Sequence, residues 1–340
     1  MKKIICTFLC AALICGVFAA CSANDNAKKA ETNGVKSKIS IVCTVFPIYD
    51  WVTNILGEKA DNADVTMLLD TGADLHSYQP TANDIIKISE CDLFIYVGGE
   101  SDEWVDDALE NATNKNMKVV NLMQVLGDRA KEEEVVEGMQ AEHEEHEEGE
   151  EHEEGEEHEE ETEYDEHVWL SLKNADLFVE EIAEKLGETD PENKTSYDDN
   201  AKKYRSELTA LDSEYKAAAD SAKVKTLLFG DRFPFRYLTD DYGLKYYAAF
   251  VGCSAETEAS FETITFLANK VDELGLKYVM VIEGGDGKIA NTVIDNTKGK
   301  NQKVLTLNSM QKATTEDVKK GVTYLGIMRS NLEVLKTALS

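Results

Sequence analysis

Short apolar runs alternate with segments of helical spacing along most of the chain. The apolar runs cover 39–45, 65–69, 93–97, 118–122, 225–229, 244–250, 278–282 and 304–307. Helical spacing covers 48–56, 104–111, 233–242, 261–274, 288–297 and 316–339, and a further segment ends at Ile88 after a cap at Thr81 or Asn83. Strands that alternate with helices indicate a mostly parallel sheet covered on both faces. The pattern therefore predicts an α/β fold with two (β/α) lobes, an N-terminal lobe over 39–172 and a C-terminal lobe over 223–340.

The segment between the lobes, 173–222, has helical spacing without a strand signal. Residues 173–187 are amphipathic, and 191–221 form a long charged stretch with Pro191 in its first turn. The apolar positions of that stretch are too sparse for a coiled-coil seam. At about 1.5 Å per residue, such a helix is long enough to run along both lobes. We therefore expect a long rigid backbone helix that joins them.

The N-terminus has the pattern of an export signal. Two lysines precede an apolar run over 4–20, and Cys21 follows it. Residues 18–21 resemble the bacterial lipobox, in which the cysteine is diacylated. An ordinary secretory signal or a transmembrane anchor is the alternative, but the run is short for a membrane span and a polar tract follows it. We predict a signal peptide over 1–20, a lipid on Cys21 and a flexible tether over 21–38, with the folded part extracytoplasmic, at the cell surface or in the periplasm.

The chain is strongly acidic, with a formal net charge of −31. Such a surface attracts cations and repels nucleic acid, so we expect no nucleic-acid partner. Apart from Cys21 and the cysteines of the signal, the sequence contains Cys43, Cys91 and Cys253. An odd and widely spaced set is not a disulfide framework, and Cys43 and Cys91 lie in apolar runs that favour buried packing.

The His-rich tract, Glu142–Glu161, contains only Glu, His and Gly. Because it has no apolar side chain to offset the entropy of ordering, it is predicted to lie in a disordered acidic loop over 131–163. Its histidines are His143, His146, His152 and His158. Repeated His and Glu side chains bind Zn²⁺ weakly, so we interpret the tract as an accessory that concentrates metal. A charge-rich linker with incidental histidines is the alternative.

The remaining histidines lie at junctions between predicted strands and helices. His76 follows the second predicted strand in GADLHSYQP, and His167 lies in DEHVWLSL, where the chain returns to apolar packing. Ligands bind at the carboxyl ends of parallel strands, so both imidazoles are placed to face a cleft. The pair can hold a metal, or it can be a buried pair of neutral imidazoles with a structural role. The His-rich tract shifts the interpretation toward metal.

Two motifs carry a family resemblance. GADLHSYQPTANDIIKISECDLFIYVGGESDEW resembles the G-x-D-P-H-x-Y-x-P motif and the following helix, strand and Gly-rich turn of the zinc and manganese substrate-binding lipoproteins that deliver metal to ABC importers. DEHVWLSLKNA resembles that family's D-x-H-x-W-L-S-P-x-N-A, and a His-rich loop before this motif is a feature of the zinc-binding members. The resemblance spans essentially the whole mature chain. It implies two lobes joined by a long helix, a metal ion in the cleft between them, and His76 and His167 as ligands from the first lobe.

The resemblance leaves the contribution of the second lobe open. The family's third ligand falls on Arg232, which cannot bind a metal, and its fourth position falls near Asn308. The candidates for the missing ligand are Asp231, Glu258 and Glu283. We favour Glu283, because it ends a predicted strand and ligands bind at strand ends. Alternatively, Asp231 and Arg232 pair with acidic groups of the cleft, and the two histidines bind metal together with water or a histidine of the tract.

We interpret the chain as a monomeric, lipid-anchored binding protein, and not an enzyme, that captures Zn²⁺ and delivers it to an ABC-type metal permease in the membrane. Nitrogen ligands favour Zn²⁺ over Mn²⁺, and a manganese-binding homologue is the alternative. A surface metal buffer or adhesin, with its main site in the His-rich tract, is another. A secreted zinc hydrolase would need an open coordination position and a signature such as H-E-x-x-H, which the sequence lacks.

Overall fold

The computed structural model describes residues 38–140, 163–254 and 258–340. The chain from Ser37 to Ser340 forms a compact unit. The predicted signal peptide, Cys21 and nearly all of the predicted tether lie outside the described residues, as do the four histidines of the tract: His143, His146, His152 and His158. Within the described ranges, no helix combines the length and the apolar character needed to cross a membrane.

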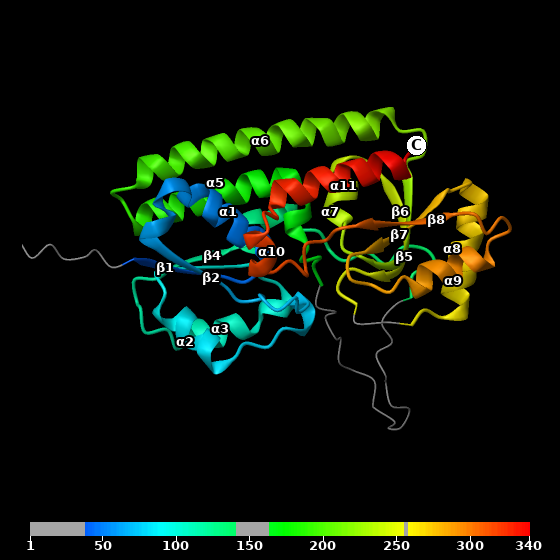
Figure 1. Ribbon diagram of the computed structural model, residues 1–340. Helices are drawn as coiled ribbons and strands as arrows, with labels where there is room; N and C mark the ends of the chain where they lie inside the picture. The colour runs from blue at the N-terminus through cyan, green and yellow to red at the C-terminus, as the bar shows by residue number, and fades with distance from the viewer. Residues whose placement is uncertain (1–37, 141–162, 255–257) are drawn as a thin grey trace, which may run out of the picture. The chain divides into compact units, whose positions relative to one another are not determined.

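The first lobe is built on a parallel sheet with the strand order β2-β1-β3-β4. Its strands are β1 (Ile39–Cys43), β2 (Ala63–Met67), β3 (Leu93–Tyr96) and β4 (Lys118–Asn121). Its helices are α1 (Phe46–Leu56), α2 (Ala82–Glu90), α3 (Trp104–Glu110) and α4 (Leu122–Leu126). Helices α2 and α3 lie on one face of the sheet and α1 on the other (Figure 1), so β1 and β3 are apolar on both faces. Thr81 caps α2, because its hydroxyl accepts a hydrogen bond from the Asp84 amide.

The second lobe repeats this plan with the strand order β6-β5-β7-β8, again all parallel. Its strands are β5 (Thr226–Phe233), β6 (Lys245–Val251), β7 (Tyr278–Ile282) and β8 (Lys303–Leu307). Its helices are α7 (Arg236–Asp241), α8 (Phe261–Leu274), α9 (Lys288–Asn296), α10 (Thr315–Lys319) and α11 (Tyr324–Ala338). The parallel sheets confirm the predicted α/β fold with two lobes.

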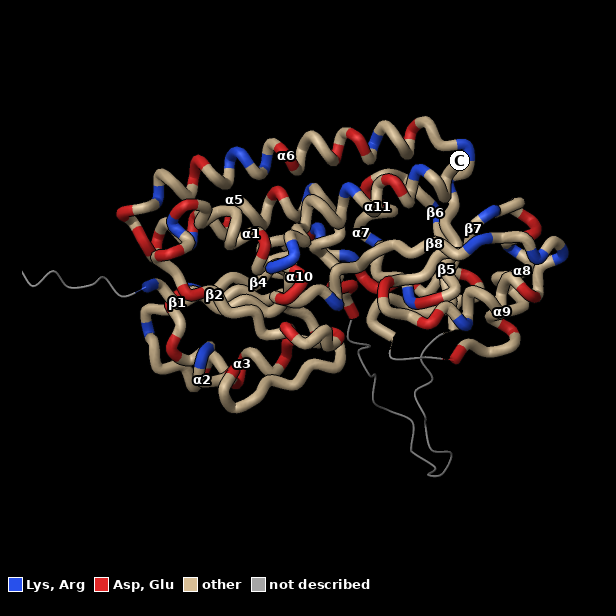
Figure 2. Tube along the Cα trace, viewed as in Figure 1, with Lys and Arg blue, Asp and Glu red and all other residues tan. Residues whose placement is uncertain are grey.

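Helices α5 (Leu172–Thr189) and α6 (Lys194–Ser221) join the lobes. Helix α6 packs against α5, against α1 of the first lobe and against α11 of the second (Figure 1). Buried tyrosines attach it to both lobes: the Tyr204 hydroxyl donates to Asp50 on α1 at 3.1 Å, and the Tyr215 hydroxyl donates to the Met328 carbonyl on α11 at 2.6 Å. Lysine, arginine and acidic residues are distributed along the length of α6 (Figure 2). These contacts confirm the predicted backbone helix.

Strand β5 is longer than its apolar run predicts. The run ends at Phe229, but the strand continues to Phe233, and Arg232 pairs with Phe250 of β6 after a register shift. Asp231 and Arg232 therefore lie on a strand, not in the turn that the sequence indicates. The additional pairing depends on the neighbouring strand, which local hydropathy does not describe.

Two other boundaries differ from the predictions. The final helix, expected over 316–339, is divided into α10 and α11, and Gly321 between them has a φ of 91°, which a helix does not allow. Residues 131–140, expected in the disordered loop, are paired with the rest of the structure. The Glu133 amide donates to the Glu163 carbonyl at 2.9 Å, and the Gln140 amide donates to the Ala249 carbonyl at 2.9 Å.

Candidate metal centre

His76 is held in a 3₁₀ turn, Leu75–Ser77, that follows β2. The Asp74 carboxylate caps this turn by accepting a hydrogen bond from the His76 amide at 3.2 Å. On the ring, Nδ1 lies 2.9 Å from the Ser101 hydroxyl and 3.4 Å from Oε2 of Glu166. The turn and these partners leave Nε2 as the ring nitrogen that is available to a ligand.

His167 is fully buried and is oriented by Asp165. Oδ1 of Asp165 accepts hydrogen bonds from the His167 amide at 2.8 Å and from its Nδ1 at 3.0 Å. The next turn is locked by Trp169, whose Nε1 donates to the Ser309 carbonyl at 2.9 Å and whose carbonyl accepts from the Tyr324 hydroxyl at 2.7 Å. The apolar residues after His167 thus fix its backbone against the second lobe, as their hydropathy suggests.

The Nε2 atoms of His76 and His167 face each other at 3.2 Å. A carboxylate only accepts hydrogen bonds, so Asp165 places the proton of His167 on Nδ1, and Glu166 favours the same tautomer of His76. With both protons on Nδ1, the two Nε2 lone pairs point at each other, and a cation between them removes their repulsion. A tetrahedral ion with bonds of about 2.0–2.1 Å holds two nitrogens roughly 3.3 Å apart, so the observed spacing fits a shared metal ion.

Cys253 completes the group, and sequence reasoning did not select it. Each of His76, His167 and Cys253 offers one ligand atom, a ring nitrogen or the sulfur, and these three atoms lie within 4.8 Å of one another. Cys253 stands two residues after β6, and the rule that ligands bind at strand ends could have found it. A side chain at the preceding residue, Gly252, would place its Cβ 3.0 Å from Cε1 of His167, so this glycine permits the close approach.

The space around the imidazoles is acidic. Burial raises the pKa of Glu166, but hydrogen bonds from His76 and Ser101 outweigh burial and hold that pKa below its usual range. Burial likewise raises the pKa of Asp74, but the Arg232 guanidinium and His76 together hold that pKa below its usual range. Both carboxylates are therefore ionised at neutral pH, and their charge favours a cation at the histidines.

A cleft of about 550 Å³ lies beside this group. His76 lines the cleft, and its other polar lining residues include Asp74, Ser77, Asp231, Arg232, Glu283, Lys288 and Lys312. Because these residues come from both lobes, the cleft gives an ion a route to His76 from outside.

Comparison with known proteins identifies the family. Residues 41–338 match the family described as "Zinc-uptake complex component A periplasmic". The chain belongs to this family. It is 33% identical to the zinc-binding lipoprotein AdcA of Streptococcus pneumoniae over 337 residues, which cover 99% of this chain and 61% of that protein. It is 31% identical to the high-affinity zinc uptake system protein ZnuA of Bacillus subtilis over 321 residues, which cover 94% of this chain and 93% of the relative.

Solved structures show the same fold. The Zn(II)-bound ZnuA-like domain of Streptococcus pneumoniae AdcA superimposes with a TM-score of 0.67 at 29% identity, over 89% of this chain and 99% of that domain. The Bacillus subtilis metal-dependent lipoprotein YcdH gives a TM-score of 0.69 at 28% identity, over 89% of this chain and 99% of that chain. The present chain spans only 56–61% of the length of the AdcA proteins that it matches.

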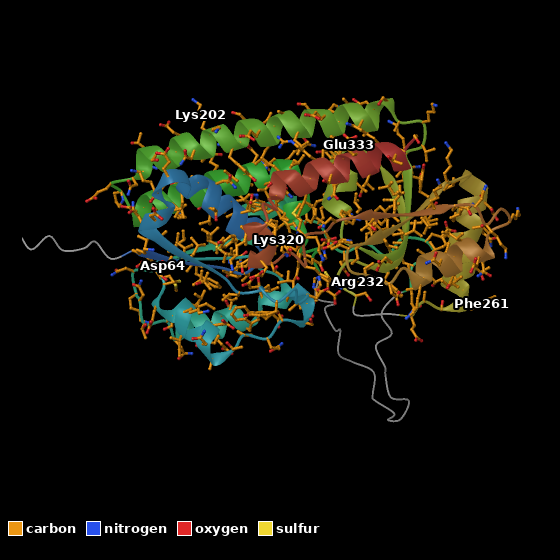
Figure 3. The ribbon with its side chains drawn as sticks, in the orientation of Figure 1. Asp64, Lys202, Arg232, Phe261, Lys320 and Glu333 are labelled. Carbon is orange, nitrogen blue, oxygen red and sulfur yellow. The ribbon has the colours of Figure 1, made fainter. Side chains whose placement is uncertain are left out.

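Arg232, on which the family resemblance places the third ligand, forms an ion pair with Asp74 across the lobes. Figure 3 labels Arg232. Another of its guanidinium nitrogens donates to the Ser254 carbonyl at 3.1 Å. This agrees with the predicted alternative in which Arg232 pairs with an acidic group of the cleft. It also means that the guanidinium links the turn of His76 to the segment that carries Cys253.

The other predicted carboxylates have different partners. Glu283 accepts hydrogen bonds from the Ser309 amide at 2.7 Å, the Ser309 hydroxyl at 2.9 Å and the Gln311 amide at 3.1 Å. Asp231 accepts from its neighbour's amide at 2.9 Å and from the Ile282 amide at 3.1 Å. In the parts of the chain that the structure describes, neither carboxylate joins the group at the histidines.

The sequence also points to Glu258 and Asn308. Glu258 is exposed at the edge of the cleft. Asn308 holds the turn after β8, since its side chain accepts from the Met310 amide at 2.8 Å and its carbonyl accepts from Asn331 at 2.8 Å.

Proposed function

We propose that this protein captures Zn²⁺ between His76 and His167 and delivers it to an ABC-type permease in the membrane. The observation that carries the proposal is the pair of Nε2 atoms 3.2 Å apart, each on a ring whose Nδ1 meets a carboxylate. Carboxylates behind ligating histidines fix the tautomer and raise the basicity of the ligand. The relatives described above are named as zinc-binding or zinc-uptake proteins, which supports the same ion.

Imidazole ligands favour Zn²⁺ over Mn²⁺, which prefers carboxylate and water oxygens. Glu283 and Asp231, the carboxylates proposed from the sequence as second-lobe ligands, are engaged with backbone amides, so binding the ion through them would break several hydrogen bonds. The proposal therefore rests on His76 and His167.

We further propose that the chain is exported, lipidated at Cys21 and held at the membrane as a monomer. The lipoprotein name of the AdcA relative supports this placement. The histidines of the tract, Glu142–Glu161, would then raise the local concentration of Zn²⁺ near the cleft. Losing the tract should lower the rate of capture more than the affinity, because the tract adds weak sites and leaves the two buried or half-buried histidines intact.

Calorimetric zinc titration of the purified chain tests the proposal. We expect His167→Ala and His76→Ala to remove tight binding, and deletion of 142–161 to leave one tight site of nearly unchanged affinity. The His-rich tract is the matched control, since its deletion removes four histidines but leaves the carboxylate-supported pair. If the deletion abolishes tight binding and the single substitutions do not, the main site is the tract and the proposal fails.

A further inference from the structure

Cys253 is placed against the two histidines by contacts on both sides of it. Its amide donates to Glu133 at 3.1 Å, and the next residue, Ser254, is fixed through its carbonyl by Arg232 at 3.1 Å. Before it, Gly252 packs on the ring of His167 so closely that an added Cβ would lie 3.0 Å from Cε1. Tertiary contacts therefore hold the backbone at three successive residues, 252–254.

The other cysteines of the described residues have different surroundings. Cys43 is fully buried in β1, and Cys91 is fully buried with its thiol 3.2 Å from the Ile88 carbonyl and 3.4 Å from the sulfur of Met117. Cys253 is half-buried, and its sulfur lies in a group with ring nitrogens of His76 and His167. Packing explains the first two thiols, whereas the third lies beside the Glu133 carboxylate and two imidazoles.

We propose that Cys253 is the third ligand of the captured ion, so that the centre is a His₂Cys site in which sulfur takes the place of the family ligand missing at Arg232. The inference rests on the proposed function. A tetrahedral ion with a Zn–S bond of about 2.3 Å and Zn–N bonds of about 2.0–2.1 Å holds sulfur and nitrogen roughly 3.6 Å apart. The ligand atoms already lie within 4.8 Å, so a shift of about 1 Å on binding closes the site.

The chemistry of the step is a ligand exchange. The metal–sulfur bond forms as the thiol loses its proton to solvent, with no change of oxidation state, and a water ligand leaves the ion. A single thiolate lowers the charge of the bound dication by one. Thiolate selects Zn²⁺ and related borderline or soft ions over Mn²⁺, so Cys253 would make this centre more selective than a site of nitrogen and oxygen ligands.

Cobalt(II) substitution tests the inference, because thiolate bound to cobalt gives an intense sulfur-to-metal charge-transfer absorption in the near ultraviolet. We expect the wild-type chain to show this band at one equivalent of Co²⁺. Cys253→Ser should lose the band, retain weaker binding and lose the part of the preference for Zn²⁺ over Mn²⁺ that sulfur adds to the two imidazoles, in competition titrations. Cys91→Ala, the matched control, should keep both the band and the preference.

The spectrum of the wild-type chain and those of two variants separate the inference from the proposed function. A cobalt complex that depends on His167 but has no charge-transfer band overturns the role of Cys253 and leaves the proposed function standing. Binding that is unaffected by His167→Ala overturns the proposed function itself. A band that persists in Cys253→Ser also refutes the inference, because another thiol would then be the ligand.

Discussion

Asp165 offers a direct test of how the centre is organised, because its carboxylate orients His167. The Asp165 side chain is only 3% exposed, and both hydrogen bonds from His167 end on its Oδ1. Asp165→Asn preserves the shape of the side chain and an accepting oxygen but removes the negative charge. The imidazole then keeps its position and loses basicity toward the metal.

The magnitude follows from the two kinds of hydrogen bond. A hydrogen bond to a charged group contributes about 1.5–3 kcal/mol, and one between neutral groups about 0.5–1.5 kcal/mol. The midpoints of these ranges differ by about 1.2 kcal/mol, close to the ~1.4 kcal/mol that corresponds to a tenfold change in Kd. We expect the zinc Kd of Asp165→Asn to rise about tenfold, within the 10–100-fold range typical for partners of ligating histidines.

Competition titration with a chromophoric zinc chelator at pH 7.5 measures this change. Asp176→Asn is the matched control, since Asp176 pairs with Arg205 at 2.8 Å and takes no part in the centre. Urea unfolding of each metal-free chain separates a loss of affinity from a loss of folding. Unchanged zinc affinity in a folded Asp165→Asn chain would refute the reasoning, and so would a loss as complete as that of His167→Ala.

The remaining predictions concern the buried Asp50 and the glycine beside Cys253. Burial raises the pKa of Asp50 from 3.8 to about 6, so the native state holds this proton more tightly than the unfolded chain and loses stability as pH rises from about 4 to 6. The full effect is of the order of 3 kcal/mol. In urea unfolding, Asp50→Asn should therefore be about as stable as wild type at pH 4. At pH 7.5 it should be more stable by about 1–2 kcal/mol, because the weakened hydrogen bond from Tyr204 offsets part of the gain. Gly252→Ala would place a Cβ 3.0 Å from both Cε1 of His167 and the Phe233 carbonyl, so we expect a loss of about 1–3 kcal/mol in unfolding free energy and weaker zinc binding in calorimetry.

Each of these has its own control and contrary result. Equal gains at pH 4 and pH 7.5 would show that Asp50→Asn acts through packing and not through the proton. For the glycine, Gly299→Ala is the control, because the atom nearest an added Cβ there is the end of the Asn301 side chain, which can move. Wild-type zinc affinity in Gly252→Ala would show that the close contact with His167 does not position the ligand.

Much of the fold follows from local patterns in the sequence. Alternating apolar runs and helical segments predicted the parallel sheets of both lobes, and the long polar stretch predicted α6. These predictions succeed because the spacing of apolar residues, the helix caps and the helix breakers all act within a few residues along the chain. The predicted ligand pair, His76 and His167, is likewise marked by motifs whose residues are neighbours in sequence.

The tertiary structure decided the rest. Pairing with β6 extends β5 through Asp231 and Arg232, and the turn after β6 brings Cys253 to His167. Glu283, which the strand-end rule favoured as a ligand, accepts a hydrogen bond from the backbone amide of Ser309 instead. The surroundings of these residues depend on which strand ends meet across the lobes and on which backbone amides need acceptors there. Those contacts join residues that are far apart in the chain, so a local sequence pattern does not reveal them. The sequence by itself therefore predicted most of the elements and the two candidate histidines, and long-range packing determined the ends of β5 and what surrounds the histidines.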